Sequence, residues 1–303
     1  TSELTEQEKN EIINSQKNTS KKIHELEDVV REIEEKLKNL LLDMPNILQE
    51  DIQLGKEDDA IIVKEGFGEL DIKVRQKNEL SKPPSDIKVE QATGHWEIGK
   101  QFGIIDFERG VKVSGQRFYL LLNEGAKLQR SLITWMLDKH TSRGYSEVYP
   151  PALVKEEMLI GTAQLPKFGE NLYRDIEEDL WLVPTAEVPI TNMYRDEILA
   201  QESLPIKHVA YTPCFRREKM SAGKEVKGIK RGHQFDKVEL VHFVHPEESY
   251  TAHEQLLEDS LQIIQELGLR YRVIQLASED TSFASSKTYD IEVWAPGSNE
   301  WLE

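Results

Sequence analysis

The segment FRREKMSAGKEVKGIKRGHQFDKVE, residues 215–239, decides how the central part of this chain folds. An apolar run precedes it, and a basic stretch containing Gly223 and Gly228 separates its two ends. Glycine lets a connecting loop turn tightly and lie close to another backbone. The pattern predicts two long antiparallel strands, near 208–216 and 234–243, joined as a hairpin.

The hairpin carries side chains suited to a planar, anionic ligand. Strand alternation places Arg216 and Glu218 on one face and Arg217 on the other, while Arg231 and Phe235 share a face of the returning strand. A guanidinium can hold phosphate or carboxylate oxygens through paired hydrogen bonds. A carboxylate can accept from the amine of adenine, and an aromatic ring can stack on the base. These residues predict a nucleotide site, and the alternative is an ordinary charged hairpin.

The same segment resembles motif 2 of a class II aminoacyl-tRNA synthetase. Together with TAEVPITNMYRDEIL at 185–199 and FASSKTYDIEVWAPG at 283–297, it makes the chain similar to bacterial and organellar seryl-tRNA synthetases from about residue 94 to 303. The resemblance implies a ligase that activates L-serine with ATP to seryl-adenylate and transfers serine to tRNA(Ser). It also implies an α+β catalytic domain, an antiparallel sheet flanked by helices.

The resemblance implies a role for each motif residue. Arg216, Glu218 and Arg231 are assigned to catalysis, with Arg216 bridging the serine carboxylate and the α-phosphate. Glu218 would accept from the adenine amine, and Phe235 would stack on the ring. Arg231 and the backbone of residues 232–234 would hold the triphosphate and ribose side. The expected ATP-binding residues are Arg216, Arg217, Glu218, Arg231, Gly232, His233, Gln234, Phe235 and Glu303.

The resemblance places serine beside the TAE run. The expected serine-binding residues are Thr185, Ala186, Glu187, Arg216 and Glu239. The two carboxylates, Glu187 and Glu239, can satisfy the ammonium and the hydroxyl of serine. A hydrolytic acid–base pair is the alternative for these carboxylates.

Glu303 aligns with the glutamate that opens the family's Glu-x-Ser-Ser segment, a contact for Mg²⁺ and ATP. The family pattern continues into motif 3, whose arginine holds the γ-phosphate, and this sequence stops at Glu303. We therefore expect the polypeptide as written to lack part of its ATP site. The expected cofactors are ATP, as a substrate, and Mg²⁺. With one cysteine and no helical histidine pair, no zinc site is expected.

The N-terminal region has apolar residues three and four positions apart. They are Ile23, Leu26, Val30, Ile33, Leu37, Leu40 and Met44. This spacing predicts an α-helical coiled-coil arm that ends at Pro45. In the family, two such helices grip the long extra arm of serine tRNA, and this chain has about one, so residues 1–50 are expected to form a partial tRNA-binding arm.

The rest of the chain is expected to hold a connector at 51–105 and a catalytic domain at 106–303. Further strands are predicted near 116–122, 146–149, 180–183, 271–276 and 288–294, and helices at 126–142 and 247–266. LQRSLITWMLDKHTSRGYSEVYPP, residues 128–151, resembles motif 1, which implies a homodimer. Without the family it is a helix followed by a proline-ended edge strand.

Composition limits the partners. A net charge of −17 argues against a broad nonspecific nucleic-acid surface, although the loop at 219–231 is locally basic. No apolar run reaches the roughly 20 residues that cross a bilayer, so no membrane contact and a cytoplasmic location are expected, with the organellar matrix as the alternative. Cys214 lies in an apolar strand and is expected to be a small buried residue.

Two other function classes remain open at this stage. A synthetase paralogue with impaired catalysis could act as an RNA-binding or regulatory protein, favoured by the missing motif 3 and disfavoured by the intact motif 2 residues. A coiled-coil scaffold would account for residues 1–50 alone.

Overall fold

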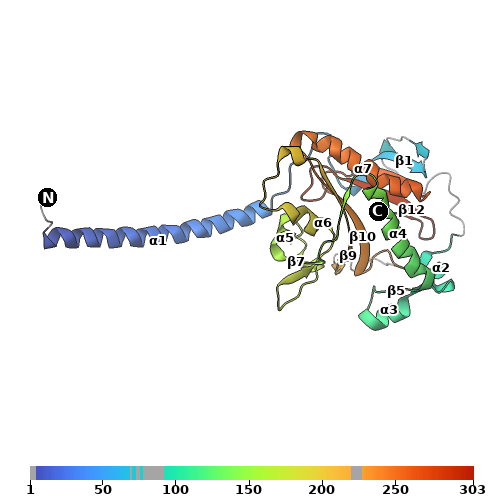
Figure 1. Ribbon diagram of the computed structural model, residues 1–303, viewed down its shortest axis with the longest axis horizontal. Coiled ribbons are helices and arrows are strands. Elements are labelled where there is room, and N and C mark those ends of the chain that lie inside the picture. Colours follow the sequence, from blue (N-terminus) through green and yellow to red (C-terminus); the bar gives the residue numbers. More distant parts are fainter. Residues whose placement is uncertain (1–4, 69, 73–75, 78–91, 220–226) are drawn as a thin grey trace. The chain divides into compact units, whose positions relative to one another are not determined.

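The computed structural model describes residues 5–68, 70–72, 76–77, 92–219 and 227–303. The chain divides into two compact units, Thr1–Pro45 and Asn46–Glu303. The first unit contains one helix, α1 (Glu6–Leu42), and the second is an α+β domain (Figure 1). Both parts of the predicted fold class are thereby confirmed.

Helix α1 is polar around most of its circumference, with a narrow apolar seam. Its seam residues are exposed, as in Leu26, Ile33 and Leu40 at 55%, 57% and 66%. Ion pairs one helical turn apart, such as Glu32–Lys36 at 2.6 Å, line the outer surface. The helix ends just before Pro45, because proline disfavours the helical conformation of the residue before it.

The predicted hairpin is the centre of the second unit. Strands β9 (Ile206–Phe215) and β10 (Gln234–Phe243) pair antiparallel over their full length, from Ile206↔Phe243 to Phe215↔Gln234. Strand β6 (Ser146–Val148) adds to β9 in the parallel sense. A parallel neighbour requires a long crossover connection, which residues 149–205 provide. The smaller sheet is therefore mixed.

In the described ranges, the larger sheet has six strands. Its order is β13 (Glu300–Leu302), β12 (Tyr289–Ala295), β11 (Arg270–Gln275), β1 (Ile61–Phe67) and β2 (Leu70–Ile72), and β3 (Gln76–Lys77) pairs with β1. Every residue of β11 is buried, so this strand needs a hydrogen-bonded neighbour on each side. Strand β1, within the range expected as a connector, supplies one of them.

Two long helices lie against these sheets. Helix α4 (Asn123–Thr141) contacts β9 and β10, and helix α7 (Ser249–Glu266) contacts β10 and β12 (Figure 1). The remaining helices and strands are α2 (His95–Gln101), β4 (Ile105–Asp106), α3 (Phe107–Ser114), β5 (Leu120–Leu121), β7 (Leu153–Lys155), α5 (Glu156–Gly161), β8 (Leu180–Leu182) and α6 (Glu187–Thr191). Among the residues that the structure describes, 3₁₀ turns span Glu57–Asp59, Gly169–Asn171, Asn192–Tyr194, Gln201–Ser203 and Pro246–Glu248. In the described part of the chain, no helix is both long and apolar enough to cross a membrane.

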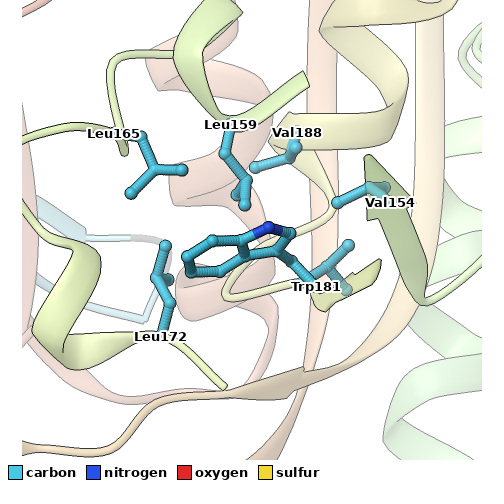
Figure 2. Close-up of a cluster of buried hydrophobic side chains, with 7 residues drawn as sticks. Val154, Leu159, Leu165, Leu172, Trp181 and Val188 are labelled. Atoms are coloured by element: carbon cyan, nitrogen blue, oxygen red, sulfur yellow. The ribbon is translucent and has the colours of Figure 1, made fainter. Parts of the chain in front are cut away.

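A buried apolar cluster supports the segment that leads to the TAE run. Its members are Val154, Leu159, Leu165, Leu172, Trp181, Val183 and Val188. Figure 2 shows the Trp181 indole lying among the aliphatic side chains. Val183 and Val188 are fully buried and flank residues 184–187, so packing of this cluster fixes where that run lies.

Candidate functional site

The neck of the hairpin is closed by reciprocal hydrogen bonds. The Arg216 amide donates to the His233 carbonyl at 2.9 Å, and the His233 ring Nδ1 donates to the Arg216 carbonyl at 3.0 Å. Phe215 also donates its amide to the Val183 carbonyl at 2.9 Å, which joins the hairpin to the TAE side. The backbone that carries the motif residues is therefore held in place by these hydrogen bonds.

One detail of the predicted geometry is wrong. Strand β9 ends at Phe215 and β10 begins at Gln234, so Arg216–Glu218 and Arg231–His233 lie just outside the strands. Glu218 has a φ of +49°, which turns the chain away from an extended path. Strand alternation consequently does not set the faces of Arg216, Arg217 and Glu218.

Arg216 and Phe235 come together as a pair. The guanidinium carbon lies 5.0 Å from the centre of the Phe235 ring, within range of a cation–π contact. Its Nε donates to the Pro184 carbonyl at 3.3 Å. Arg216 thus reaches from the end of β9 to the start of the TAE run.

Glu218 and Arg231 bind each other across the base of the loop. Arg231 Nη1 lies 3.3 Å from Glu218 Oε2, and Arg117 Nη1 donates to the Glu218 carbonyl at 3.1 Å. The Glu218 side chain is 11% exposed and that of Arg231 49%. The sequence assigned these two residues to different parts of ATP, and the structure places them side by side.

The other predicted ATP contacts occupy different environments. Arg217 donates its amide to the Asn171 carbonyl at 2.8 Å, while Gln234 is exposed. Gly232 is buried, and a Cβ there would lie 3.0 Å from the Gln234 carbonyl oxygen. Gly223, together with Lys224 and Glu225 of the basic loop, lies outside the described residues.

A compact polar group forms beside Arg216, which we name the Thr185 cluster: Thr185, Glu187, Lys237 and Glu239. The Thr185 hydroxyl donates to Glu239 Oε2 at 2.6 Å and accepts from the Glu187 amide at 3.2 Å. Lys237 Nζ lies 2.8 Å from Glu239 Oε2 and 3.2 Å from Thr185 Oγ1. The predicted Thr185, Glu187 and Glu239 therefore do meet.

Ala186 contributes differently from its neighbours. Its side chain is fully buried against Ile190 and Ala210. Because the side chain is buried in this apolar cluster, only the backbone of Ala186 is available to a ligand.

The Thr185 cluster carries two carboxylates with unequal surroundings. Burial, and then the charge of Glu239, raises the pKa of Glu187 above its ordinary value, while Lys237 and Arg216 oppose the shift. A cation bound between the carboxylates would relieve this repulsion. The two carboxylates, with Lys237 and Arg216 beside them, could therefore hold an ammonium group.

Lys237 is the functional candidate that sequence analysis missed. It lies two residues from both Phe235 and Glu239 in β10, so the three side chains share one face of the strand. That alternation was visible in the sequence and could have identified Lys237.

Cys214 is buried and unpaired, as predicted. Burial raises the pKa of its thiol, which disfavours the reactive thiolate.

Glu303 follows β13 and lies near other acids. Burial, followed by the charges of Glu303, Glu292 and Asp280, raises the pKa of Asp290 to about 7. Among the described residues, no three histidine, cysteine or acidic side chains are grouped to hold a metal. Mg²⁺ at phosphate sites commonly uses one or two carboxylates together with phosphate oxygens and water. The acidic surroundings of Glu303 fit such a partial ligand set.

Comparisons with known proteins show which proteins this chain is similar to. The family described as "tRNA synthetase class II core domain (G, H, P, S and T)" matches residues 170–303. A protein of Roseiflexus castenholzii named serine–tRNA ligase is 62% identical over 209 residues, 69% of this chain and 49% of that protein. One of Dehalococcoides mccartyi with the same name is 51% identical over 283 residues, 93% of this chain and 65% of that protein.

Among solved structures, seryl-tRNA synthetase from Pyrococcus horikoshii complexed with ATP superposes with a TM-score of 0.84 at 34% identity. The match covers 97% of this chain and 67% of that one. The chain thus spans between about half and two thirds of the length of these relatives.

Proposed function

Because the chain belongs to the seryl-tRNA synthetase family of class II tRNA synthetases, we propose that the whole protein activates L-serine with ATP and transfers serine to tRNA(Ser). The observation that carries the proposal is the position of Arg216. Its guanidinium lies over Phe235, and its Nε reaches Pro184, the residue before the Thr185 cluster. Arg216 therefore contacts both Phe235, which would stack on adenine, and the segment that leads into the Thr185 cluster, which would bind serine.

The first half-reaction needs two anions to meet. A serine carboxylate oxygen attacks the α-phosphorus of ATP in line, the new P–O bond forms, and the bond to the bridging oxygen breaks to release pyrophosphate. Arg216 would hold the carboxylate and the α-phosphate together and offset the charge that develops on phosphorus. Phe235 would stack on adenine. Mg²⁺, bound through Glu303 and the phosphates, would supply further positive charge to the leaving pyrophosphate.

The Thr185 cluster would recognise serine. Glu187 and Glu239 can accept hydrogen bonds from the substrate ammonium. Thr185, Glu239 and Lys237 are hydrogen-bonded to one another and can also bond the substrate hydroxyl. Alanine would leave such partners unpaired, a large penalty, whereas threonine adds one methyl that only shape can exclude. Selection against alanine should therefore be stronger than selection against threonine.

Other properties of the whole protein are also proposals. Helix α1 would be part of an arm that binds tRNA(Ser), because its exposed apolar seam suits a second helix. The motif 1 segment would form a homodimer, and its Leu128 and Tyr149 are 58% and 88% exposed. We place the protein with its tRNA substrate in the cytoplasm, or in an organellar matrix.

A catalytically impaired paralogue is the less favoured alternative. Arg216, Glu187, Glu239 and Phe235 are all present and adjoin one another, and the similar proteins carry the name serine–tRNA ligase. A paralogue that had lost catalysis would have no need to keep this set.

The deciding experiment is pyrophosphate–ATP exchange with the full-length protein. We expect exchange that depends on serine and is weak with alanine. Robust exchange with proline or threonine, and none with serine, would refute the proposal.

Removal of residues 1–45 should spare pyrophosphate–ATP exchange and depress transfer of serine to tRNA. Equal losses in both activities would show that α1 only stabilises the fold.

A further inference from the structure

Three segments that are far apart in the sequence meet at the far end of the basic loop. The Ile229 amide donates to His95 Nε2 at 2.9 Å, at the start of α2. Lys230 forms an ion pair with Glu300, the first residue of β13. Sequence analysis assigns the next residue, Arg231, to ATP binding, and the proposed chemistry gives these contacts no role.

Gly228 shows how close this junction is. Its φ is +76°, and a Cβ at this position would lie 1.8 Å from His95 Nε2. Any other residue would therefore both strain the backbone and collide with the ring. The chain passes directly against His95 before it reaches Arg231.

His95 must be neutral to make this contact. A ring nitrogen that accepts an amide hydrogen needs its lone pair, and an imidazolium has none to offer. Burial, and then the charge of Lys230, lowers the pKa of His95, while Glu300 opposes the shift. The ring also packs edge-on against Trp96, with centroids 5.2 Å apart, which limits its rotation.

Arg231 is consequently held from both sides. The preceding residues are fixed by His95–Ile229 and Lys230–Glu300, and the following His233 is fixed to Arg216. Between these anchors the Arg231 side chain is half exposed and lies 3.3 Å from Glu218. Anchoring the chain in advance lowers the entropy lost when its side chain binds a ligand.

We propose that His95 is a positioning residue that fixes the Ile229–Arg231 segment so that Arg231 meets the phosphate end of ATP. This inference rests on the proposed function for the identity of the ligand. It predicts an effect on ATP and none on serine, because the Thr185 cluster has no contact with the junction among the interactions described above.

The test uses full-length protein in four forms: the parent, His95→Ala, His95→Gln and His245→Ala. Glutamine can place its Oε1 near the position of Nε2 and accept the same amide hydrogen. His245 is a matched control, since its Nδ1 accepts the Glu247 amide at 3.4 Å outside the site. Loss of one such hydrogen bond typically changes an equilibrium roughly fivefold. We expect His95→Ala to raise the KM for ATP by about that factor with the KM for serine unchanged, His95→Gln to restore it, and His245→Ala to have no effect.

A second measurement does not depend on activity. Hydrogen–deuterium exchange at the Ile229 amide should be slow in the parent and in His95→Gln, and faster in His95→Ala. Unchanged amide exchange in His95→Ala, equal effects on both KM values, or no recovery with glutamine would overturn the proposal. If the parent shows no serine-dependent pyrophosphate–ATP exchange, the proposed function fails. Hydrogen–deuterium exchange at the Ile229 amide and direct ATP binding by the four forms then still decide the role of His95.

Discussion

Two groups of polar side chains include residues of β10, and they differ in how far their polar atoms are open to solvent. The Thr185 cluster opens to solvent through Lys237, whose side chain is 36% exposed, and has two carboxylates near one ammonium. The second group, the Tyr145 cluster, consists of Tyr145, His242 and Asp259. Here the Tyr145 hydroxyl donates to Asp259 at 2.7 Å and lies 2.6 Å from His242 Nε2.

Most polar atoms of the Tyr145 cluster have partners inside the protein, although the buried His242 Nδ1 and Arg143 Nη1 have no hydrogen bond. Gln255 donates to the remaining Asp259 oxygen at 3.1 Å, and Arg143 lies 3.7 Å from that oxygen. Tyr145 and Asp259 are 4% and 8% exposed. Buried polar groups that bond mainly to one another stabilise the fold, whereas a group that keeps charge facing solvent can bind a ligand. The two clusters should therefore respond to mutation in opposite ways.

The largest expected effect is on activity, from Arg216→Ala. Removing a cation that touches both reacting anions costs roughly 3 kcal/mol or more of transition-state stabilisation, so adenylation should fall at least a hundredfold. The free energy of unfolding should change little, since the Arg216 backbone hydrogen bonds with His233 remain. Pyrophosphate exchange and urea denaturation on the same preparation measure both. Near-normal exchange would show that Arg216 does not hold the reacting groups.

The next effect is on stability, from Tyr145→Phe. This change deprives buried Asp259 of one donor and His242 of its partner, and an unsatisfied buried group costs about 1–3 kcal/mol. Urea denaturation should show that loss while the KM for serine stays constant. An unchanged denaturation midpoint together with weaker serine binding would reverse the comparison between the clusters.

A further expected effect on stability is a pH dependence through His242. Burial, and then the charge of Lys207, lowers the pKa of His242 to about 4 in the folded protein, against 6.5 as its ordinary value. The unfolded chain therefore binds a proton more readily between these two values. The stability contributed by neutral His242 is complete above about pH 6.5 and is lost as the pH falls toward 4.

Comparison with His242→Gln separates the contribution of His242 to the pH dependence from the contributions of the other titrating groups. The difference in free energy of unfolding between parent and variant should shrink as the pH falls through that window. A difference that stays constant from pH 7 to pH 4 would contradict the assigned burial of His242.

Much of this architecture could be predicted from local patterns. The seam of α1 and the alternation of β9 and β10 repeat over many residues, so they identified a helix and a hairpin within a few positions. Strand β1 was missed together with its near neighbours β2 and β3. Its pairing with β11 joins residues about two hundred positions apart, and no local pattern specifies such a pairing.

The site divides in the same way. The motif residues were found by resemblance, but their faces were predicted by extending strand alternation beyond Phe215, where the positive φ of Glu218 breaks it. The ion pair between Glu218 and Arg231 depends on that turn, so the sequence did not predict it. Lys237 was within reach of alternation, and the Ile229–His95 contact joins segments that only the tertiary fold brings together.

The central claim is that Arg216 and the Thr185 cluster form one site for the two halves of seryl-adenylate. The most direct measurement is calorimetric binding of a non-reactive sulfamoyl analogue of seryl-adenylate to the full-length parent, Arg216→Ala and Tyr145→Phe. We predict tight binding by the parent and by Tyr145→Phe, and binding weakened at least tenfold by Arg216→Ala. Equal affinity for the parent and Arg216→Ala would contradict the claim.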